Sequence, residues 1–251
     1  MRDNERFWSL EEIQEQMNAN PVKTDEQKAD IQKRWDERKQ RNASLTNEQI
    51  VNHAEVSKKI GIAQGKEMSF EEANELYGNV NYSKGYGYQN NCQSCVVANE
   101  LRRRGFDVTA QEYVRKQGNV PYELGKYTES AWIDPKTGQA PKSLQAGGFY
   151  LDKYKLKNKP ISVLNNDLKD LTKYVGRYHI KFLNKGKGSS GHILTAERLT
   201  DGTLRIYDPQ TGKIEDWVKV LSKKIRLDYG AKILRVDDLL INTDIIDCIV
   251  I

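Results

Sequence analysis

The second half of the chain contains several short stretches in which apolar and polar residues alternate. Successive side chains of a β-strand point to opposite faces of a sheet, so this pattern is typical of strands with one buried face. The turns KGKGSSG and TDG separate the first three stretches, which indicates neighbouring antiparallel strands. The predicted strands are RYHIKFL (177–183), HILTAERL (192–199), TLRIYD (203–208) and KILRV (232–236).

The remaining segments of this half differ in pattern. IEDWVKVLSKK at 214–224 predicts a helix that returns to the sheet. The apolar run IIDCIVI at 245–251 predicts a final buried strand. The second half should therefore form a twisted antiparallel sheet, with one helix returning to it.

The first 77 residues carry repeated signals for helix starts. A Ser or Thr followed three residues later by Glu or Gln fits the capping box, in which two unpaired backbone N–H groups are satisfied reciprocally. Four short helices are predicted from four such pairs: Ser9 with Glu12, Thr24 with Gln27, Thr46 with Gln49, and Ser69 with Glu72. We expect residues 1–77 to form a helical appendage or linker, and residues 78–251 to form the main domain.

A loop and one further helix connect these two halves. The segment GNVNYSKGYGYQNN at 78–91 has the Gly, Asn and Tyr content of a loop, and it leads into a helix predicted at 92–104. Gly105 suits the end of this helix, and the three arginines before it complement the negative end of the helix dipole. Helices followed by an antiparallel sheet predict an α+β fold.

Composition and charge exclude several classes of function. Of the 251 residues, 40 are basic and 35 are acidic, and the resulting net charge of +5 is mild, so nucleic acid is not expected as a partner. The longest apolar runs are far below the roughly 18 residues that span a bilayer, so no membrane association is expected. The start MRDNERFWSL lacks the apolar segment of a secretory signal, which favours a cytoplasmic location.

The cysteines bear on metal and redox chemistry. The chain has three, an odd number that cannot form a closed disulfide framework. Cys92 and Cys95 form a C-x-x-C pair, but the other Cys and His residues provide no second closely spaced pair for a structural zinc site. A redox role is disfavoured because a polar loop, not a strand, precedes the pair. The sequence therefore predicts no metal and no other cofactor.

A nucleophilic cysteine is the remaining interpretation. The N–H groups and dipole at a helix start favour the thiolate form of a cysteine placed there. Such a cysteine needs a base and a group that orients the base. His192 begins one predicted strand and Asp208 ends the next, so both side chains can lie at one edge of the sheet, facing the Cys helix.

Simpler interpretations exist for each of these residues. A cysteine on a helix is often a small apolar core residue. His192 could be an exposed residue at a strand end, and Asp208 could serve only the local geometry of the turn DPQTG. The order Cys, His, Asp across a helix and a hairpin favours the catalytic interpretation.

Two segments resemble a known family. NCQSCVVANELRRRGFDVTA and then GHILTAERLTDGTLRIYDPQTG resemble the papain-fold toxin family of bacterial polymorphic toxins and related phage-encoded proteins, described as protein-glutamine deamidases. The resemblance covers residues 78 to 225. It implies a papain-like fold in which a nucleophile helix packs on a twisted antiparallel sheet. It also implies Cys92 as nucleophile, His192 as general base and Asp208 as its orienting partner, assisted by Gln210.

The choice between the two thiols rests on opposing signals. Papain-like proteases use the second cysteine of a C-x-x-C, with an oxyanion Gln six residues before it, and Gln89 stands six residues before Cys95. The Asn-Cys pair at the helix start, however, is the element that resembles the toxin family. We therefore predict Cys92 as the nucleophile and Cys95 as the alternative, which would otherwise be a core contact.

The resemblance implies a reaction as well. Cys92 would attack a glutamine carboxamide of a target protein, form a thioester and leave glutamate after hydrolysis. The backbone N–H of residue 92 and an amide of Gln89 or Asn91 would hold the oxyanion. Peptide-bond cleavage by a protease, transfer to an amine by a transglutaminase, and a non-catalytic phage-associated module are the alternatives.

Partners and delivery follow from the same resemblance. The expected partner is a protein substrate, and the resemblance also allows an immunity protein. The enzyme would act in the cytoplasm of the target or producing cell, delivered by a secretion system or a phage particle. Tyr86, Tyr88 and Trp132 are candidates for shaping the substrate cleft.

Overall fold

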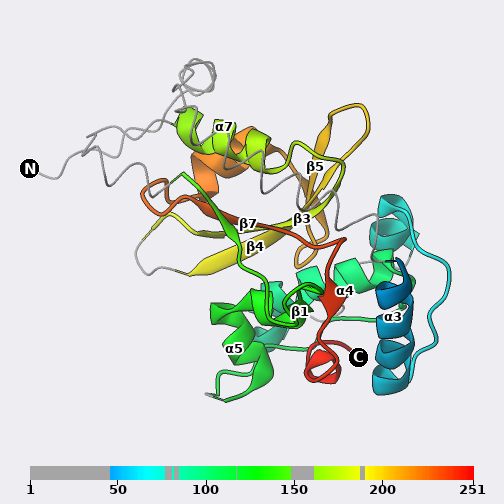
Figure 1. Cartoon of the computed structure of the whole chain (residues 1–251). Coiled ribbons are helices and arrows are strands. Elements are labelled where there is room, and N and C mark those ends of the chain that lie inside the picture. The colour runs from blue at the N-terminus through cyan, green and yellow to red at the C-terminus, as the bar shows by residue number, and fades with distance from the viewer. Residues whose placement is uncertain (1–45, 77–80, 82–84, 117, 148–160, 187–189) are drawn as a thin grey trace, which may run out of the picture.

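The computed structural model describes residues 46–76, 81, 85–116, 118–147, 161–186 and 190–251 (Figure 1). The helix starts predicted at Ser9 and Thr24 lie outside these residues. The described part of the chain is α+β, with helices packed on an antiparallel sheet. No helix within it has the length and apolar character needed to cross a bilayer.

The central sheet has six strands in the order β2-β7-β3-β4-β5-β6, and every neighbouring pair is antiparallel. The strands are β2 (Leu144–Ala146), β3 (Gly176–Leu183), β4 (Gly191–Arg198), β5 (Leu204–Asp208), β6 (Lys213–Glu215) and β7 (Ala231–Arg235). The four strands predicted from alternation are confirmed as β3, β4, β5 and β7. A separate pair joins β1 (Trp132–Ile133) to β8 (Leu240–Ile241).

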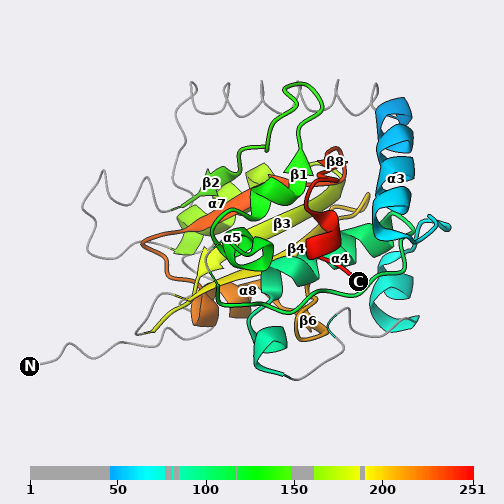
Figure 2. The ribbon, with the colours of Figure 1, turned by 90° about the horizontal axis from the view of Figure 1, so that it is seen from below.

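A hydrophobic core lies on each face of the central sheet. Helix α7 (Ile161–Leu171) packs on one face through residues such as Leu164 and Leu168, which share a core with Ile180 and Ile233. Helix α4 (Cys92–Arg103) covers the other face, where it meets Ile193 and Leu234. Figure 1 shows the two helices on opposite sides of the sheet, and Figure 2 shows α4 and α5 (Val120–Lys126) in front of it.

Helix α4 is buried nearly all round, since every residue from Gln93 to Arg102 is buried. The predicted start at Cys92 and the predicted glycine after its end are both confirmed. Gly105 has φ of 93°, a left-handed conformation that favours glycine. Its backbone also approaches Gly65 so closely that a Cβ would lie 2.4 Å from the Gly65 carbonyl oxygen.

The boundary predicted at residue 77 does not separate two cores. Helix α3 (Thr46–Ile60) belongs to the appendage in that prediction, yet Val56 lies in the core around α4. The Asn52 side chain donates to the carbonyl of Ile241 at 2.9 Å and accepts from its N–H at 2.8 Å. A polar residue and an apolar residue of α3 thus attach it to the main domain.

The capping box predicted at Ser69 is confirmed. Its hydroxyl accepts from the Glu72 N–H at 3.1 Å, and the Glu72 carboxylate accepts from the Ser69 N–H at 2.7 Å. The helical turn that follows includes the π-helical segment η1 (Glu72–Leu76).

Two predictions for the C-terminal part need correction. IIDCIVI forms a short 3-10 helix, η5 (Ile246–Cys248), not a strand, and only Val250 makes a bridge, with Ala110. Ile246, Ile249 and Val250 are buried in the α4 core, and burial alone does not distinguish a strand from a tight helical turn. The helix predicted at 214–224 begins later, as α8 (Trp217–Lys219), and continues as the π-helical η4 (Val220–Lys224).

Candidate active site

The hairpin of β4 and β5 brings His192 and Asp208 together. Thr195 of β4 pairs with Tyr207 of β5, so the start of one strand lies beside the end of the other. The distance from His192 Nε2 to Asp208 Oδ2 is 2.9 Å. Asp208 thereby occupies one ring nitrogen, and Nδ1 remains for a second partner.

Cys92 lies beside the same ring. It is the first residue of α4 and is partly buried. Burial opposes the charged form of the imidazole, but hydrogen bonding to Asp208 and to Cys92, with the charges of both, raises the pKa of His192 to about 10. The structure therefore places the three predicted residues in one chain of contacts, Cys92, His192 and Asp208.

Asp208 is held in its charged form at the base of this arrangement. It is 2% exposed, and its second oxygen, Oδ1, accepts from the Gln210 N–H at 3.1 Å. Burial alone would raise its pKa, but the hydrogen bond to His192 and the charge of the imidazolium outweigh burial and lower it. A charged carboxylate can hold the ring in one orientation and stabilise its protonated form.

Cys95 lies in a different environment from Cys92. It has no exposed surface, and its Sγ donates to Asn91 Oδ1 at 3.4 Å. Burial, with contributions from Cys92 and Asp208, raises the pKa of the Cys95 thiol well above its usual value. Cys95 is thus a protonated core residue, and of the two thiols only Cys92 faces the imidazole.

Asn91 cannot serve as the oxyanion donor that the sequence suggested. Its side-chain Nδ2 donates to Asn81 Oδ1 at 3.0 Å and to the Gln111 carbonyl at 2.9 Å. An amide nitrogen has only two protons, so both are used in these contacts. Gln89, the other candidate, is exposed at the end of the 3-10 helix η2 (Tyr86–Gln89) and does not line the cleft described below.

Gln210 joins the aspartate turn to the start of α4. Its N–H binds Asp208, and its side-chain Nε2 lies 3.5 Å from both the Tyr88 carbonyl and Asn91 Oδ1. Asn81 Nδ2 adds bonds to the Tyr88 and Gln210 carbonyls, at 2.7 and 3.2 Å. We call Asn81, Asn91 and Gln210 the amide network. It connects the loop before α4 with the turn that contains Asp208.

Gln93 contacts the sulfur and was not predicted. Its Nε2 donates to the Pro121 carbonyl at 3.0 Å, which fixes the orientation of the amide and directs Oε1 towards Cys92. The distance from Cys92 Sγ to this Oε1 is 3.3 Å. The only sequence signal was its position next to Cys92, because Pro121 lies in a segment that had no predicted role.

The sulfur and the imidazole border an open cleft of about 510 Å³. We call it the Cys92 cleft. Its walls come from the loop before α4, the segment around residue 113, α5, β3 and the start of β4. The lining side chains include Tyr86, Gln93, Tyr113, Arg115, Tyr122, Thr128, Lys181 and Ser190, with Cys92 and His192.

Of the three aromatic residues proposed to shape the cleft, only one lines it. Tyr86 does line it and is 68% exposed. Tyr88 does not line it, and its carbonyl instead belongs to the contacts of the amide network. Trp132 is fully buried in β1, where its ring meets His179 at 5.6 Å and Arg104 at 5.3 Å, so the prediction that it shapes the cleft is wrong.

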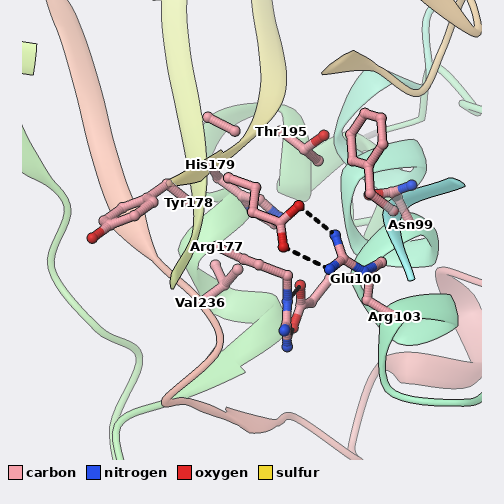
Figure 3. A pocket seen from close by; sticks show the side chains of 11 residues that line it. Asn99, Glu100, Arg103, Arg177, Tyr178, His179, Thr195 and Val236 are labelled. Carbon is pink, nitrogen blue, oxygen red and sulfur yellow. Dashed lines mark hydrogen bonds and ion pairs between the residues drawn. The ribbon is translucent and has the colours of Figure 1, made fainter. Parts of the chain in front are cut away.

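The far end of α4 is attached to the sheet by ion pairs. Glu100 binds Arg104 at 2.8 Å and Arg177 of β3 at 2.7 Å. Arg103 binds Glu197 of β4 at 2.7 Å. Figure 3 shows Glu100, Arg103 and Arg177 around a pocket of about 10 Å³, room for one water molecule. This pocket is too small for a substrate, so its residues have a structural role.

Burial and pairing act in opposite directions on the Glu100 carboxylate. Burial would raise its pKa. The positive charges of Arg177 and Arg104, and the hydrogen bonds that both donate, instead lower the pKa well below its usual range. Glu100 is therefore charged in the folded protein, and it binds both the buried Arg104 and the half-buried Arg177.

The described residues contain no group of three or more His, Cys, Asp or Glu side chains that could hold a metal ion. Comparison of the chain with protein-family models, with curated proteins and with solved structures finds no match to any of them.

Proposed function

We propose that this protein is a cysteine hydrolase with a papain-like arrangement that deamidates glutamine side chains of a target protein. One observation carries the proposal: His192 contacts both Asp208 and Cys92 at the wall of an open cleft. A nucleophile, a base and an orienting carboxylate in this order are the parts needed for acyl transfer to a thiol. The resemblance to the papain-fold toxin family supports glutamine as the substrate.

In the first step the Cys92 sulfur attacks the side-chain carboxamide carbon of glutamine, and its proton resides on His192. The new C–S bond creates a tetrahedral oxyanion. The first N–H groups of a helix have no partner within the helix, so the N–H of Cys92 at the start of α4 is suited to bind this oxygen. Asn91 is excluded as the second donor by its own contacts.

In the second step the C–N bond breaks and ammonia leaves. The imidazolium of His192 supplies the proton that the departing nitrogen needs, and Asp208 stabilises the imidazolium until then. The product is a thioester between Cys92 and the former glutamine side chain. Water then attacks the thioester with His192 as base, restoring the thiol and leaving glutamate. The target gains one negative charge.

The test is incubation with a bacterial or host lysate, followed by measurement of ammonia and by peptide mass spectrometry. The native protein should release ammonia and produce a mass increase of about 1 Da at glutamine, the result of hydrolysing the acyl-enzyme. Cys92→Ala should produce neither signal, whereas Cys95→Ala is the matched control and should retain both.

Other outcomes would redirect the proposal. New peptide termini that depend on Cys92 would identify a protease, and amine adducts at glutamine would identify a transglutaminase. If active-site-intact protein produced none of these modifications, the proposed chemistry would be wrong and a non-catalytic module would be favoured.

A further inference from the structure

The charged side chains that line the Cys92 cleft are all basic, although Glu129 lies near Lys181 and Asp208 binds His192 behind the lining. Among the described residues that line it, Arg115 and Lys181 carry positive charge, His192 is a third cation when protonated, and none is Asp or Glu. The chain as a whole is nearly balanced, with 40 basic and 35 acidic residues. The positive lining is therefore a local property of this cleft.

Arg115 is placed to meet a ligand. It is exposed, and none of the described residues forms an ion pair or side-chain hydrogen bond with its guanidinium. A guanidinium presents several N–H donors in a planar fork that matches the two oxygens of a carboxylate. Arg115 can therefore bind an acidic side chain without first breaking a contact within the protein.

Lys181 brings a second positive charge close to the reactive sulfur. Its Nζ donates to the Lys126 carbonyl at 2.9 Å and lies 3.4 Å from Thr128 Oγ1, which fixes the ammonium group at the cleft wall. An ammonium has three protons, so these contacts leave one for a ligand. Arg115 and Lys181 thus supply two cationic positions in the Cys92 cleft, and Lys181 is the one close to the sulfur.

Tyrosine rings form the other walls of the Cys92 cleft. Tyr113 and Tyr122 lie with ring centroids 6.2 Å apart, and the Lys126 ammonium lies 4.8 Å from the Tyr122 centroid. Tyr86 is largely exposed. Such rings offer an apolar body and a polar tip, which suits an extended peptide whose glutamine stem must pass between them.

From this lining we propose that the Cys92 cleft selects a glutamine flanked by acidic residues, with Arg115 binding a carboxylate of the same segment. The inference names the substrate class of the proposed deamidase and rests on that proposal. Binding and chemistry can nevertheless be measured separately, because an inactive variant keeps the cleft.

The test uses Cys92→Ala protein and three fluorescently labelled peptides of equal length. Each has a central glutamine, and the flanks are Asp/Glu, Ser/Asn or Lys. Anisotropy titrations at low salt should show the acidic peptide binding most tightly, and its advantage should shrink as salt screens the charges. Equal binding of the acidic and lysine peptides, or tighter binding of the lysine peptide, would overturn the inference.

Reversing the charge of Arg115 tests whether this residue causes the preference for the acidic peptide. In the Cys92→Ala background, Arg115→Glu should weaken binding of the acidic peptide by roughly fivefold or more and improve binding of the lysine peptide. Lys116→Glu is the matched control, because Lys116 is the exposed neighbour and does not line the cleft. If both variants had the same effect, the net charge of the protein would explain the preference and the role of Arg115 would be wrong.

The two proposals fail in different ways. Absence of ammonia release by the native protein, together with preferential binding of the acidic peptide, would reject the deamidase but retain an acidic ligand. Ammonia release without any preference among the three peptides would retain the deamidase and reject the acidic substrate class.

Discussion

The two ends of helix α4 are fixed by different kinds of interaction. At the N-terminal end, neutral amides provide the contacts: Gln93 contacts the Cys92 sulfur, and the amide network holds the preceding loop. At the C-terminal end, Glu100 and Arg103 bind charged partners on the sheet. Ion pairs at the far end restrain the helix, whereas the charged pair near the Cys92 end is formed by His192 and Asp208. The ion pairs of α4 and the candidate site thus lie about two to three turns apart on one helix.

The largest expected effect comes from removing the sulfur at the reactive end. Cys92→Ala should lower the rate of ammonia release by about 10⁴-fold or more, the scale seen when a covalent nucleophile is deleted. Its free energy of unfolding should change little because Cys92 is only partly buried. Cys95→Ala should do the opposite, keeping activity and losing about 1–2 kcal/mol of stability in urea unfolding. Loss of activity in Cys95→Ala alone would reverse the assignment of the thiols.

The next largest effect is expected at the C-terminal end of α4, where Glu100 forms its ion pairs. Glu100→Gln leaves the buried Arg104 and the half-buried Arg177 without the carboxylate that binds both, so the free energy of unfolding should fall by about 3–5 kcal/mol. Urea denaturation of the variant measures this loss. Glu71→Gln is a matched control, because Glu71 pairs with Arg205 at an exposed position and should cost less than about 1 kcal/mol. Equal losses in both variants would show that burial of the first pair is unimportant.

A smaller effect concerns pH. The pKa of His192 is raised from 6.5 to about 10, so the folded protein binds this proton more tightly than the unfolded chain. The resulting stabilisation is complete below pH 6.5 and is lost as pH rises towards about 10. Thermal unfolding midpoints across this window should therefore decline more steeply for the native protein than for Asp208→Asn, which lacks the charged partner. Identical slopes would contradict the coupling.

The smallest expected effect is that of Gln210→Ala. The side-chain contacts of Gln210 are long, at 3.5 Å, and the N–H that binds Asp208 remains in the variant. Activity should fall by less than about tenfold, the range of one or two weak hydrogen bonds. If the residue positions Asp208, the pH profile of the remaining activity should also shift, which a general loss of stability would not produce.

The strands of the sheet were predictable because their apolar positions alternate, but what covers their polar face was not. Arg177, His179 and Lys181 alternate along β3 with residues of the α7 core. The pattern suggested a solvent-exposed face. In the structure Arg177 binds Glu100 and His179 is buried against Trp132, so α4 and β1 cover these polar residues. Alternation in the sequence shows which residues are polar, but it does not show whether another element of the fold covers them.

The parts of the candidate site that could be predicted are those whose residues are brought together by a short connection in the sequence. A short turn between two strands is enough to bring His192 beside Asp208, and a loop before a helix is enough to place Cys92 at its start. Arg115 and Lys181 could not be predicted, because they come from segments that meet only after folding. Asn91 was misjudged for a similar reason, since its partner Gln111 lies twenty residues away.

The reciprocal bonds between Asn52 and the main chain of Ile241 determine where the protein can be cut. A fragment that starts at residue 78 would lose the Asn52 contacts to both polar groups of Ile241 and would uncover the part of the core against which Val56 packs. A fragment that starts at residue 46 retains both contacts. Truncation for expression or crystallisation should therefore spare α3, even though its own surface is mostly polar.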